Sequence, residues 1–464
     1  FGIVAMAMVA MGLIRVFSTS GQDLAVIRHP NPTAEHFDTA WTMSVCAGCL
    51  VALVLVAIAP LAGWYYHDPR VVPVIRFLAL APLLDGLTNI GAVAGFRRSL
   101  MFRKEFGFVV VSKLSAVIVA VPLAFALQNY WALAIAAVCG RVVTVIASYR
   151  MHPFRPHLRL TKLREIWSYS AWIQFSAIGG FFGEQADQII VGGVAGAAPM
   201  GVYNVAADFA TAPTEEIVVP ASRATFPVYA SLLHDPAGLA HSYLSVLSIT
   251  ALIALSTGFG VALVADDLVA VVFGPKWSTA ALLIPWLAIS GGLLGVARSV
   301  NAVLSVTGHA RLNAMRIWAF AALLVPAAIA GGLGWGAEGV AAARMFVTIL
   351  FIPLMFHSLM RIIPVHSAEL FACMWRPALA ALAMSAAISF AGNAISLVPL
   401  RLFCNVGMGA VVFAASVLAL WFLAGRPAGA ERILVAEAKG AMRALRTRTI
   451  EARARPSTKR QADV

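Results

Sequence analysis

Long apolar stretches follow one another along the chain, each bounded by short groups of charged residues, Pro and Gly. A transmembrane helix needs about 20 mostly apolar residues, and stretches of this kind fill the sequence as far as Phe422. Two of them, 108–126 and 403–422, are apolar on nearly every face instead of alternating with period two, which disfavours membrane β-strands. The pattern therefore predicts an all-α, polytopic membrane protein.

Thirteen transmembrane helices are predicted when the charged, Pro and Gly clusters are taken as boundaries. Their ranges are 1–27, 39–62, 72–95, 107–127, 130–149, 168–192, 199–221, 241–264, 279–305, 313–331, 336–358, 369–391 and 401–424.

The loops between these helices differ in charge according to the side of the membrane that they face. Successive loops alternate sides, and cytoplasmic loops are enriched in Lys and Arg. The basic side has fourteen such residues, namely Arg28, Arg97, Arg98, Arg103, Lys104, Arg150, Arg155, Arg159, Lys162, Arg164, Arg223, Arg311, Arg316 and Arg361. The other side has Arg70, Lys276 and Arg401. The asymmetry predicts that the basic side, and with it the C-terminus, is cytoplasmic.

Composition agrees with a membrane protein. The chain is 61% hydrophobic and 12% charged, with a formal net charge of +13, whereas soluble domains are roughly a quarter charged. Much of the positive charge lies in the tail 426–464, where an amphipathic pattern predicts an interfacial helix on anionic lipid headgroups. Nucleic acid is not an expected partner, because a basic tail beside a membrane already faces phosphate groups. Since apolar spans account for the fold, truncation after Gly425 is expected to leave function largely intact.

Two pairs of segments indicate an internal repeat. FGIVAMAMVAMGL at 1–13 resembles MGVYNVAADFATA at 200–212, and 65–87 resembles 272–295. This similarity predicts two six-helix lobes in parallel orientation, with the first helix missing ahead of Phe1, plus two C-terminal helices. The predicted parts are an N-terminal lobe with five of its six spans (1–150), a basic cytoplasmic linker (151–165), a C-terminal lobe of six spans (166–360), two additional spans (361–425) and a basic cytoplasmic tail (426–464).

Three motifs occur together in the second half: D-Q-I-I-V-G at 187–192, G-x-Y-N-V-A at 201–206 and F-G-x-x-W at 273–277. With the surrounding sequence to about Phe422, they resemble the polysaccharide and oligosaccharide flippases of the lipopolysaccharide and colanic-acid export type. That family belongs to the multidrug/oligosaccharidyl-lipid/polysaccharide (MOP) exporter superfamily. The resemblance implies about fourteen helices and a flippase that moves a polyprenyl-diphosphate-linked oligosaccharide across the bacterial inner membrane, for lipopolysaccharide or exopolysaccharide biosynthesis. Its implied partners are the lipid-linked oligosaccharide and membrane lipids, with a polysaccharide polymerase and export machinery as further candidates.

Polar residues within the predicted spans are candidates for the transport site, because ionisable groups in hydrocarbon require a water-filled cavity or a partner of opposite charge. Arginine suits a diphosphate, since its planar fork donates two parallel hydrogen bonds. The substrate-binding candidates are Arg15, Gln22, Asn89, Asn204, Arg298 and Asn301. The ion-coupling candidates are Asp85, Glu184, Asp187, Asp208 and Glu215.

An alternative explanation assigns these charges to helix packing. The acids would then pair with Arg298, Arg344 or Arg15 and hold helices together. Asp208 or Asp187 is the carboxylate expected beside Arg298 if that arginine is structural.

Motifs of catalytic domains are missing from the sequence. It has no Walker A loop, no H-E-x-x-H and no G-x-S-x-G, and no predicted loop is long enough for a soluble catalytic domain. The chain is therefore not expected to be an enzyme or to bind a cofactor or metal; H⁺ or Na⁺ are the candidate coupling ions. Two alternatives stay open: a drug or lipid II exporter of the same superfamily, and a membrane polysaccharide polymerase or acyltransferase.

Overall fold

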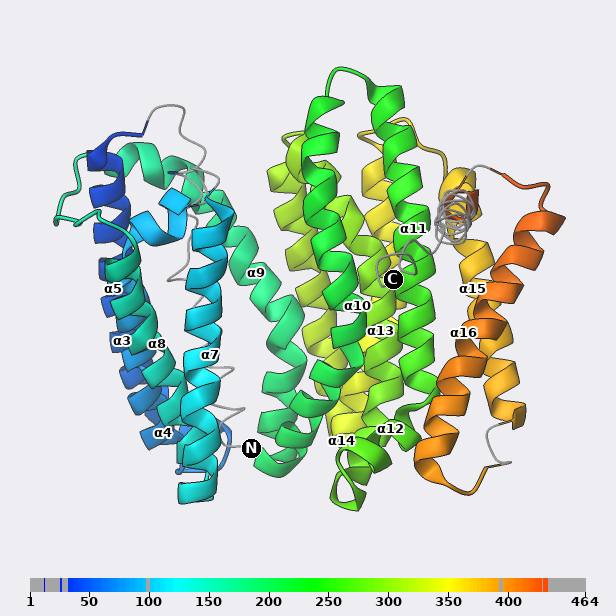
Figure 1. Ribbon diagram of the computed structural model, residues 1–464, viewed down its shortest axis with the longest axis horizontal. Helices are drawn as coiled ribbons and strands as arrows, with labels where there is room; N and C mark the ends of the chain where they lie inside the picture. Colours follow the sequence, from blue (N-terminus) through cyan, green and yellow to red (C-terminus); the bar gives the residue numbers. More distant parts are fainter. Residues whose placement is uncertain are drawn as a thin grey trace, which may run out of the picture. The chain divides into compact units, whose positions relative to one another are not determined.

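The computed structural model describes residues 12, 26, 32–96, 101–391, 395–427 and 429–432, with side chains described except at 102, 165–174, 219–224, 226–227, 310 and 391. Within these ranges the regular elements are all helical (Figure 1). They are α3 (Ala34–Tyr65), α4 (Val71–Leu78), α5 (Leu80–Leu87), the π-helix η1 (Gly91–Gly95), α7 (Phe102–Leu127), α8 (Trp131–Met151), α9 (Leu163–Ala195), α10 (Ala197–Ser231), α11 (Pro236–Leu263), α12 (Ala265–Val272), the 3₁₀-helix η2 (Pro275–Trp277), α13 (Ser278–Val306), α14 (Ala310–Met360), α15 (Ser367–Ala391) and α16 (Val398–Leu423).

The all-α, multi-pass prediction is confirmed. Among the described residues, eight helices are long and apolar enough to cross a membrane by length and composition. The first predicted span, 1–27, lies outside the described residues apart from positions 12 and 26. The predicted span 72–95 is divided into α4, α5 and η1.

Helix α14 combines the two predicted spans 313–331 and 336–358. The chain turns between them at Trp335 and Gly336, whose backbone angles are not helical; Gly336 has a φ of 60°. On either side of this turn the two segments approach closely, because a Cβ on Gly339 would overlap the Gly331 carbonyl oxygen. Trp335 is 80% exposed at the turn, as expected for an aromatic residue at a membrane interface.

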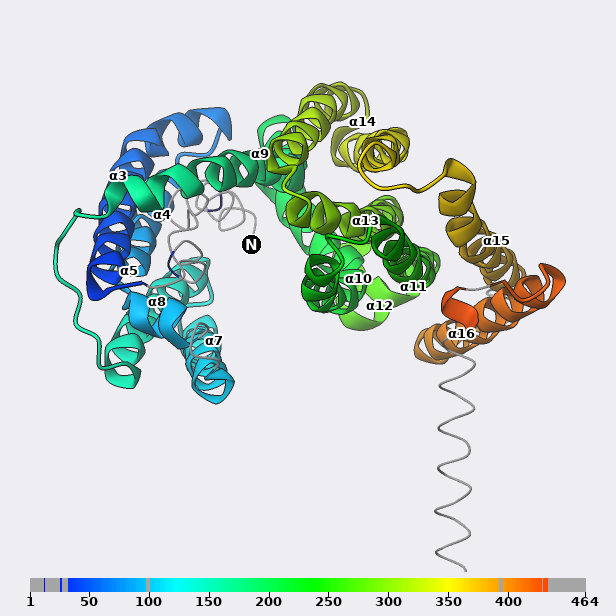
Figure 2. The same cartoon turned by 90° about the horizontal axis from the view of Figure 1, so that it is seen from above.

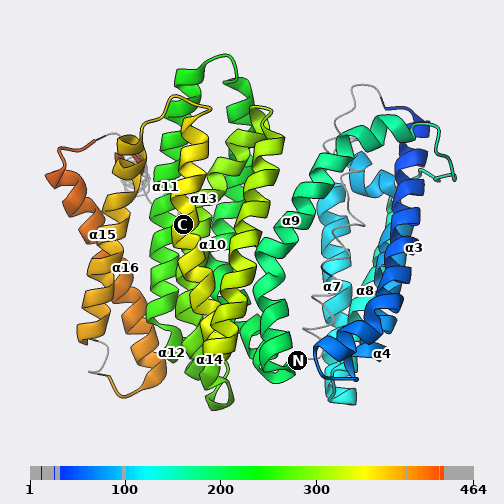
Figure 3. The same cartoon turned by 180° about the vertical axis from the view of Figure 1, so that it is seen from behind.

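The described chain forms two compact units that are interleaved along the sequence. Unit 1 comprises 1–209, 275–287 and 308–351, and unit 2 comprises 210–274, 288–307 and 352–464. The lobe, linker and tail boundaries drawn from the sequence repeat stay a prediction. In unit 1, α3 contacts α4 and α5, while α8 packs on α5 and α7 (Figure 3).

Each unit contains a close helix crossing built from two glycines. In unit 1, a Cβ on Gly48 of α3 would lie 2.4 Å from the Pro82 carbonyl oxygen, and a Cβ on Gly86 of α5 would lie 2.6 Å from that of Ser44. In unit 2, a Cβ on Gly258 of α11 would lie 2.8 Å from the Ala288 oxygen. The fourth glycine, Gly292 of α13, would place its Cβ 2.6 Å from the Ala254 oxygen. Only glycine permits such an approach of two backbones.

The two crossings have the same internal spacing. Gly86 follows Pro82 by four residues, as Gly292 follows Ala288. On the other helix, Gly48 follows Ser44 by four residues, as Gly258 follows Ala254. The internal repeat itself stays a prediction.

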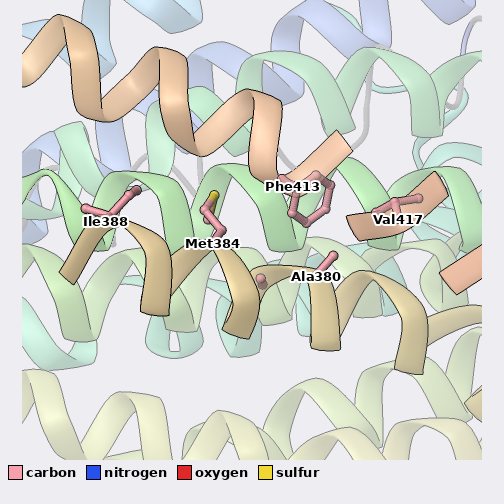
Figure 4. Packing of buried hydrophobic residues seen from close by; sticks show 6 residues of the cluster. Ala380, Met384, Ile388, Phe413 and Val417 are labelled. Carbon is pink, nitrogen blue, oxygen red and sulfur yellow. The ribbon is translucent and has the colours of Figure 1, made fainter. Parts of the chain in front are cut away.

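The two C-terminal spans form a hairpin in unit 2 (Figure 2). Ala380, Met384 and Ile388 of α15 recur every four residues and face Phe413 and Val417 of α16 (Figure 4). Partly buried side chains of α11 pack against the same cluster. This apolar contact attaches the hairpin to α11 within unit 2.

The segment 152–162, here called the linker strap, is extended and fixed along the beginning of α3. The backbone N–H groups of His157 and Arg159 donate to Asp38 Oδ1 (2.9 Å) and Thr42 Oγ1 (3.0 Å). A third N–H, from Lys162, donates to Thr39 Oγ1 at 3.3 Å. Asp38, Thr39 and Thr42 are all buried, so buried polar groups of α3 replace the backbone partners that the strap lacks.

The start of the tail folds back into unit 2. Glu431 forms an ion pair of 2.8 Å with Arg376 of α15, and both side chains are at most 4% exposed. The Ala430 N–H donates to Ser248 Oγ of α11 at 3.0 Å. These contacts argue against the expectation that truncation after Gly425 leaves function largely intact, because removing Glu431 would leave the buried Arg376 charge without its acid.

Candidate functional site

Most of the predicted site residues lie on four helices and on the start of η1. Asp85 is on α5, and Asn89 lies two residues before η1. Glu184 and Asp187 are on α9; Asn204, Asp208 and Glu215 are on α10; Arg298 and Asn301 are on α13. Arg15 and Gln22 lie outside the described residues. The described candidates are divided between the two units.

In unit 1, Asp187 is the centre of a buried polar cluster. Its Oδ2 accepts hydrogen bonds from Arg344 Nη1 at 2.6 Å and from the Tyr203 hydroxyl at 2.8 Å. Its Oδ1 accepts the Gln188 N–H at 2.9 Å. The side chains of Asp187 and Arg344 are 1% and 13% exposed. Such a satisfied, buried pair connects α9, α10 and α14, as the packing explanation of these charges expects.

In unit 2, Arg298 pairs with Glu215. Arg298 Nη2 lies 2.7 Å from Glu215 Oε1, which joins α13 to α10. The Arg298 side chain is 34% exposed and that of Glu215 is 48% exposed. Within unit 2, Glu215 is thus a carboxylate that lies beside Arg298. Helix α13 is long and apolar enough to cross a membrane, and an exposed ion pair on it is expected to face water, because lipid would leave both charges unsolvated.

Asp85 forms a second ion pair of unit 1. Arg141 Nη1 of α8 donates to Asp85 Oδ1 at 2.8 Å, and the two side chains are 36% and 20% exposed. Arg141 was not among the predicted site residues. The sequence feature that could have identified Arg141 is its charge, which is opposite to that of Asp85 in another predicted span.

Asn89 is fully buried in unit 1. Its side-chain amide donates to the Phe154 carbonyl of the linker strap at 2.7 Å, and its Oδ1 accepts the Gly91 N–H at 2.9 Å. The Asn89 N–H donates to Ser148 Oγ at 3.0 Å. In this structure Asn89 therefore positions the strap and η1, although its sequence pattern suggested a cavity residue.

The four remaining candidates differ in exposure. Glu184 and Asp208 are exposed, and Asn204 and Asn301 are partly buried. The Glu184 carbonyl accepts Arg344 Nη1 at 3.3 Å. Their roles stay predictions.

Sequence reasoning missed three polar partners: Tyr203, Glu431 and Asn405. Asn405 and Arg401 of α16 both donate to Asp267 of α12 in unit 2. A hydroxyl or amide within an apolar span has no charge to attract notice, and the position of Glu431 depends on how the chain turns after α16.

Within the part of the chain that the structure describes, no group of three or more His, Cys, Asp or Glu residues could hold a metal ion.

Asp68 and His152 lie outside the spans and have shifted pKa values. Hydrogen bonds from the Arg70 guanidinium, at 2.7 and 2.9 Å, lower the pKa of Asp68. Burial lowers the pKa of His152, and the positive charges of Lys104 and Arg155 lower it further. His152 Nδ1 accepts the Phe154 N–H at 3.2 Å, which requires that this nitrogen carry no proton.

Comparison with known proteins identifies the family. The family described as polysaccharide biosynthesis protein matches residues 1–282. The chain belongs to this family. The predicted relationship to polysaccharide exporters is therefore confirmed.

Curated relatives cover much of the chain at low identity. Lipopolysaccharide biosynthesis protein WzxC of Escherichia coli is 23% identical over 362 residues, 75% of this chain and 72% of the relative. Teichuronic acid biosynthesis protein TuaB of Bacillus subtilis is 25% identical over 304 residues, 63% of this chain and 61% of the relative. Succinoglycan biosynthesis transport protein ExoT of Rhizobium meliloti is 22% identical over 339 residues, which are 73% of this chain and 67% of the relative. The matched regions thus leave between a quarter and two-fifths of each relative uncovered.

Solved structures share the fold of this polysaccharide biosynthesis protein. The lipid II flippase MurJ in an inward closed conformation matches with a TM-score of 0.72 and 11% identity over 90% of this chain and 93% of that one. An inward-facing multidrug resistance MATE family transporter of the MOP superfamily matches with a TM-score of 0.58 and 14% identity. The match covers 78% of this chain and 89% of that one. At these identities the likeness shows the fold alone, that of the MOP transporters.

Proposed function

We propose that this protein is a flippase that translocates a polyprenyl-diphosphate-linked oligosaccharide across the bacterial inner membrane, for lipopolysaccharide or exopolysaccharide biosynthesis. The observation that carries the proposal is family membership over residues 1–282, in a chain with a MOP transporter fold. Relatives named for polysaccharide biosynthesis or transport support the substrate class. The basic loops and the C-terminus would face the cytoplasm, as the charge asymmetry of the sequence predicts.

The Arg298–Glu215 pair is the best candidate for contact with the substrate in unit 2. It combines a guanidinium on α13, a candidate membrane span, with an exposed carboxylate on α10. A guanidinium has five N–H donors and matches the geometry of phosphate oxygens, and its contact with Glu215 uses Nη2. Arriving diphosphate would compete with Glu215 for Arg298. Asn301, one turn further along α13, is a candidate for contact with the sugar.

Glu215 is also the preferred ion-coupling residue among the described acids. A carboxylate released from Arg298 by the substrate could take up a proton or Na⁺, whereas Asp187 would have to break three hydrogen bonds first. Transport would thus be driven by an ion or substrate gradient, and the protein would act as a transporter without a cofactor and not as an enzyme. A polysaccharide polymerase and export machinery are proposed partners downstream.

Transport of a defined substrate tests the proposal. Purified protein would be reconstituted in vesicles containing a polyprenyl-diphosphate oligosaccharide with a fluorescent sugar label, and an impermeant quencher would report the labelled fraction in each leaflet. We expect the protein to accelerate the exchange of label between leaflets. Vesicles with protein that exchange the label no faster than empty vesicles would contradict the proposal.

The two alternative functions are separated by the substrate in the same assay. Labelled lipid II tests a lipid II exporter, and a cationic dye tests a drug exporter. Faster transport of either than of the oligosaccharide lipid would favour that alternative. Chain extension or acylation of the labelled lipid, detected by mass spectrometry, would instead indicate a polymerase or acyltransferase.

A further inference from the structure

The linker strap presents an unusual combination of side chains on its outer side. Its backbone is fixed by Asp38, Thr39 and Thr42 of α3. The side chains of Leu158 and Leu160 are 72% and 49% exposed, and Arg159 between them is exposed as well. Exposed Leu163 and Arg164 continue this pattern into the first turn of α9. Leucines are therefore held outward next to arginines by a rigid backbone.

The strap also lies at a particular depth in the membrane. The 32 residues of α3 span about 48 Å at about 1.5 Å per residue, whereas the hydrocarbon core is about 30 Å thick. A centred α3 thus extends about 9 Å beyond the hydrocarbon at each end. The strap's partners Asp38 and Thr42 lie about 6 and 12 Å from the start of α3. The strap therefore runs at the boundary between acyl chains and headgroups.

The electrostatic surroundings of the strap favour anions. Lys104 and Arg155 both act on His152 at the start of the strap. Arg155 is held there by hydrogen bonds to the carbonyls of His152 and Phe154 and lies over the Tyr149 ring. Asp38, which contacts the strap, is buried and already accepts the His157 N–H. Positive charge therefore dominates the exposed side.

We propose that the surface formed by the linker strap and the first turn of α9 binds anionic phospholipids of the leaflet that it faces. Arg159 and Arg164 contact headgroup phosphates, for which the guanidinium geometry is suited. Leu158, Leu160 and Leu163 insert at the acyl boundary, as the apolar residues of interfacial segments do. The lipid surface thus covers leucines that would otherwise face water.

Spin labelling of Leu158→Cys tests this surface directly. The label would be attached in a protein whose five cysteines are replaced, reconstituted in vesicles of phosphatidylcholine alone or mixed with phosphatidylglycerol. The measurement compares the accessibility of the label to oxygen with its accessibility to a water-soluble nickel complex. We expect phosphatidylglycerol to raise the ratio of the first to the second several-fold. A label at Leu397, an exposed leucine before α16, is the matched control and should not respond to phosphatidylglycerol.

The arginines are tested by the double variant Arg159→Gln with Arg164→Gln. It should abolish the response of the Leu158 label to phosphatidylglycerol, whereas Arg70→Gln should leave it intact. High salt should weaken the response of the unmutated surface, because it screens exposed charges, and this measurement does not depend on how the variants fold. A Leu158 label that stays accessible to water in phosphatidylglycerol, or a response that survives the double variant and high salt, would overturn the proposal. A label shielded equally in both lipid mixtures would do so too, by indicating a protein contact.

Discussion

Arg298 of α13 and Glu215 of α10 form an ion pair of 2.7 Å whose members both stay partly exposed. The pair Arg344–Asp187 has nearly the same separation, 2.6 Å, but is almost completely buried. Exposed ion pairs contribute about 0–1 kcal/mol to stability, whereas removing one member of a buried pair costs about 3–5 kcal/mol. The two pairs are therefore expected to respond differently to substitution.

Replacing Arg298 should affect transport more than folding. Arg298→Ala leaves Glu215 solvated, so the unfolding free energy should change by less than about 1 kcal/mol. Loss of a charge-assisted contact with the diphosphate, about 1.5–3 kcal/mol, should lower transport at limiting substrate by about 10- to 100-fold. Arg298→Lys should restore part of it, because Lys lacks the bidentate fork. Vesicle transport and thermal unfolding in detergent measure the two effects, and normal transport by a stable Arg298→Ala protein would contradict the substrate role.

Replacing Arg344 should affect folding first. Arg344→Ala leaves the buried Asp187 carboxylate without its charge partner and should cost about 3–5 kcal/mol of unfolding free energy. Tyr203→Phe removes one hydrogen bond and should cost about 1–2 kcal/mol. Arg344→Met combined with Asp187→Leu should recover much of the loss, since no buried charge remains. Denaturation in detergent measures all three; an unchanged midpoint for Arg344→Ala would exclude a structural role for the pair.

The position of a tail truncation should decide its effect. A chain ending after Arg432 keeps Glu431 beside Arg376 and should fold and transport normally. A chain ending after Gly425 loses this acid and the Ala430–Ser248 hydrogen bond, and should be less stable by about 3–5 kcal/mol. Arg376→Met in the shorter chain should restore expression. Equal expression of the two truncated proteins, measured by fluorescence-detected size-exclusion chromatography, would contradict the docking of the tail.

Membrane orientation is testable with introduced cysteines. His157→Cys on the linker strap should be shielded from an impermeant thiol reagent in intact cells and react after permeabilisation. Gly334→Cys, beside the turn in α14, has no atoms within 4 Å of its Cβ position and should react from outside. Gly332 is less suitable as a reporter because its Cβ would contact Val340 and Ile190. Labelling of His157→Cys in intact cells would reverse the predicted orientation.

His152 should make stability depend on pH. Its folded pKa lies below its unfolded value of about 6.5, so the unfolded chain binds more protons between these two values. Its contribution is complete above pH 6.5 and is lost as the pH falls below this value toward the folded pKa. His152→Asn, which keeps a side-chain acceptor, should flatten the fall of the unfolding midpoint between pH 7.5 and 5.5. Identical pH profiles for the two proteins would contradict this assignment.

The sequence predicted the spans well and the side-chain partners poorly. Apolar runs such as 107–127 and 401–424 correspond closely to α7 and α16, because a helix that faces lipid on several sides requires apolar residues around its circumference. The partner of Arg298 is harder to predict. Asp208 and Glu215 share one face of α10, two turns apart, and which of them meets Arg298 depends on how α13 crosses that face. The role of Asn89 is hard to predict for a related reason, since a polar residue in an apolar run can contact water, substrate or the backbone of another segment.

The glycine crossings limit which substitutions the fold can accept. Gly86 and Gly292 each lie against a carbonyl oxygen that leaves no room for a Cβ. Any larger residue there would separate two helices, whereas a lipid-facing apolar residue can be exchanged for another at little cost. Natural variants of this chain are therefore expected to keep these glycines while the apolar residues around them vary.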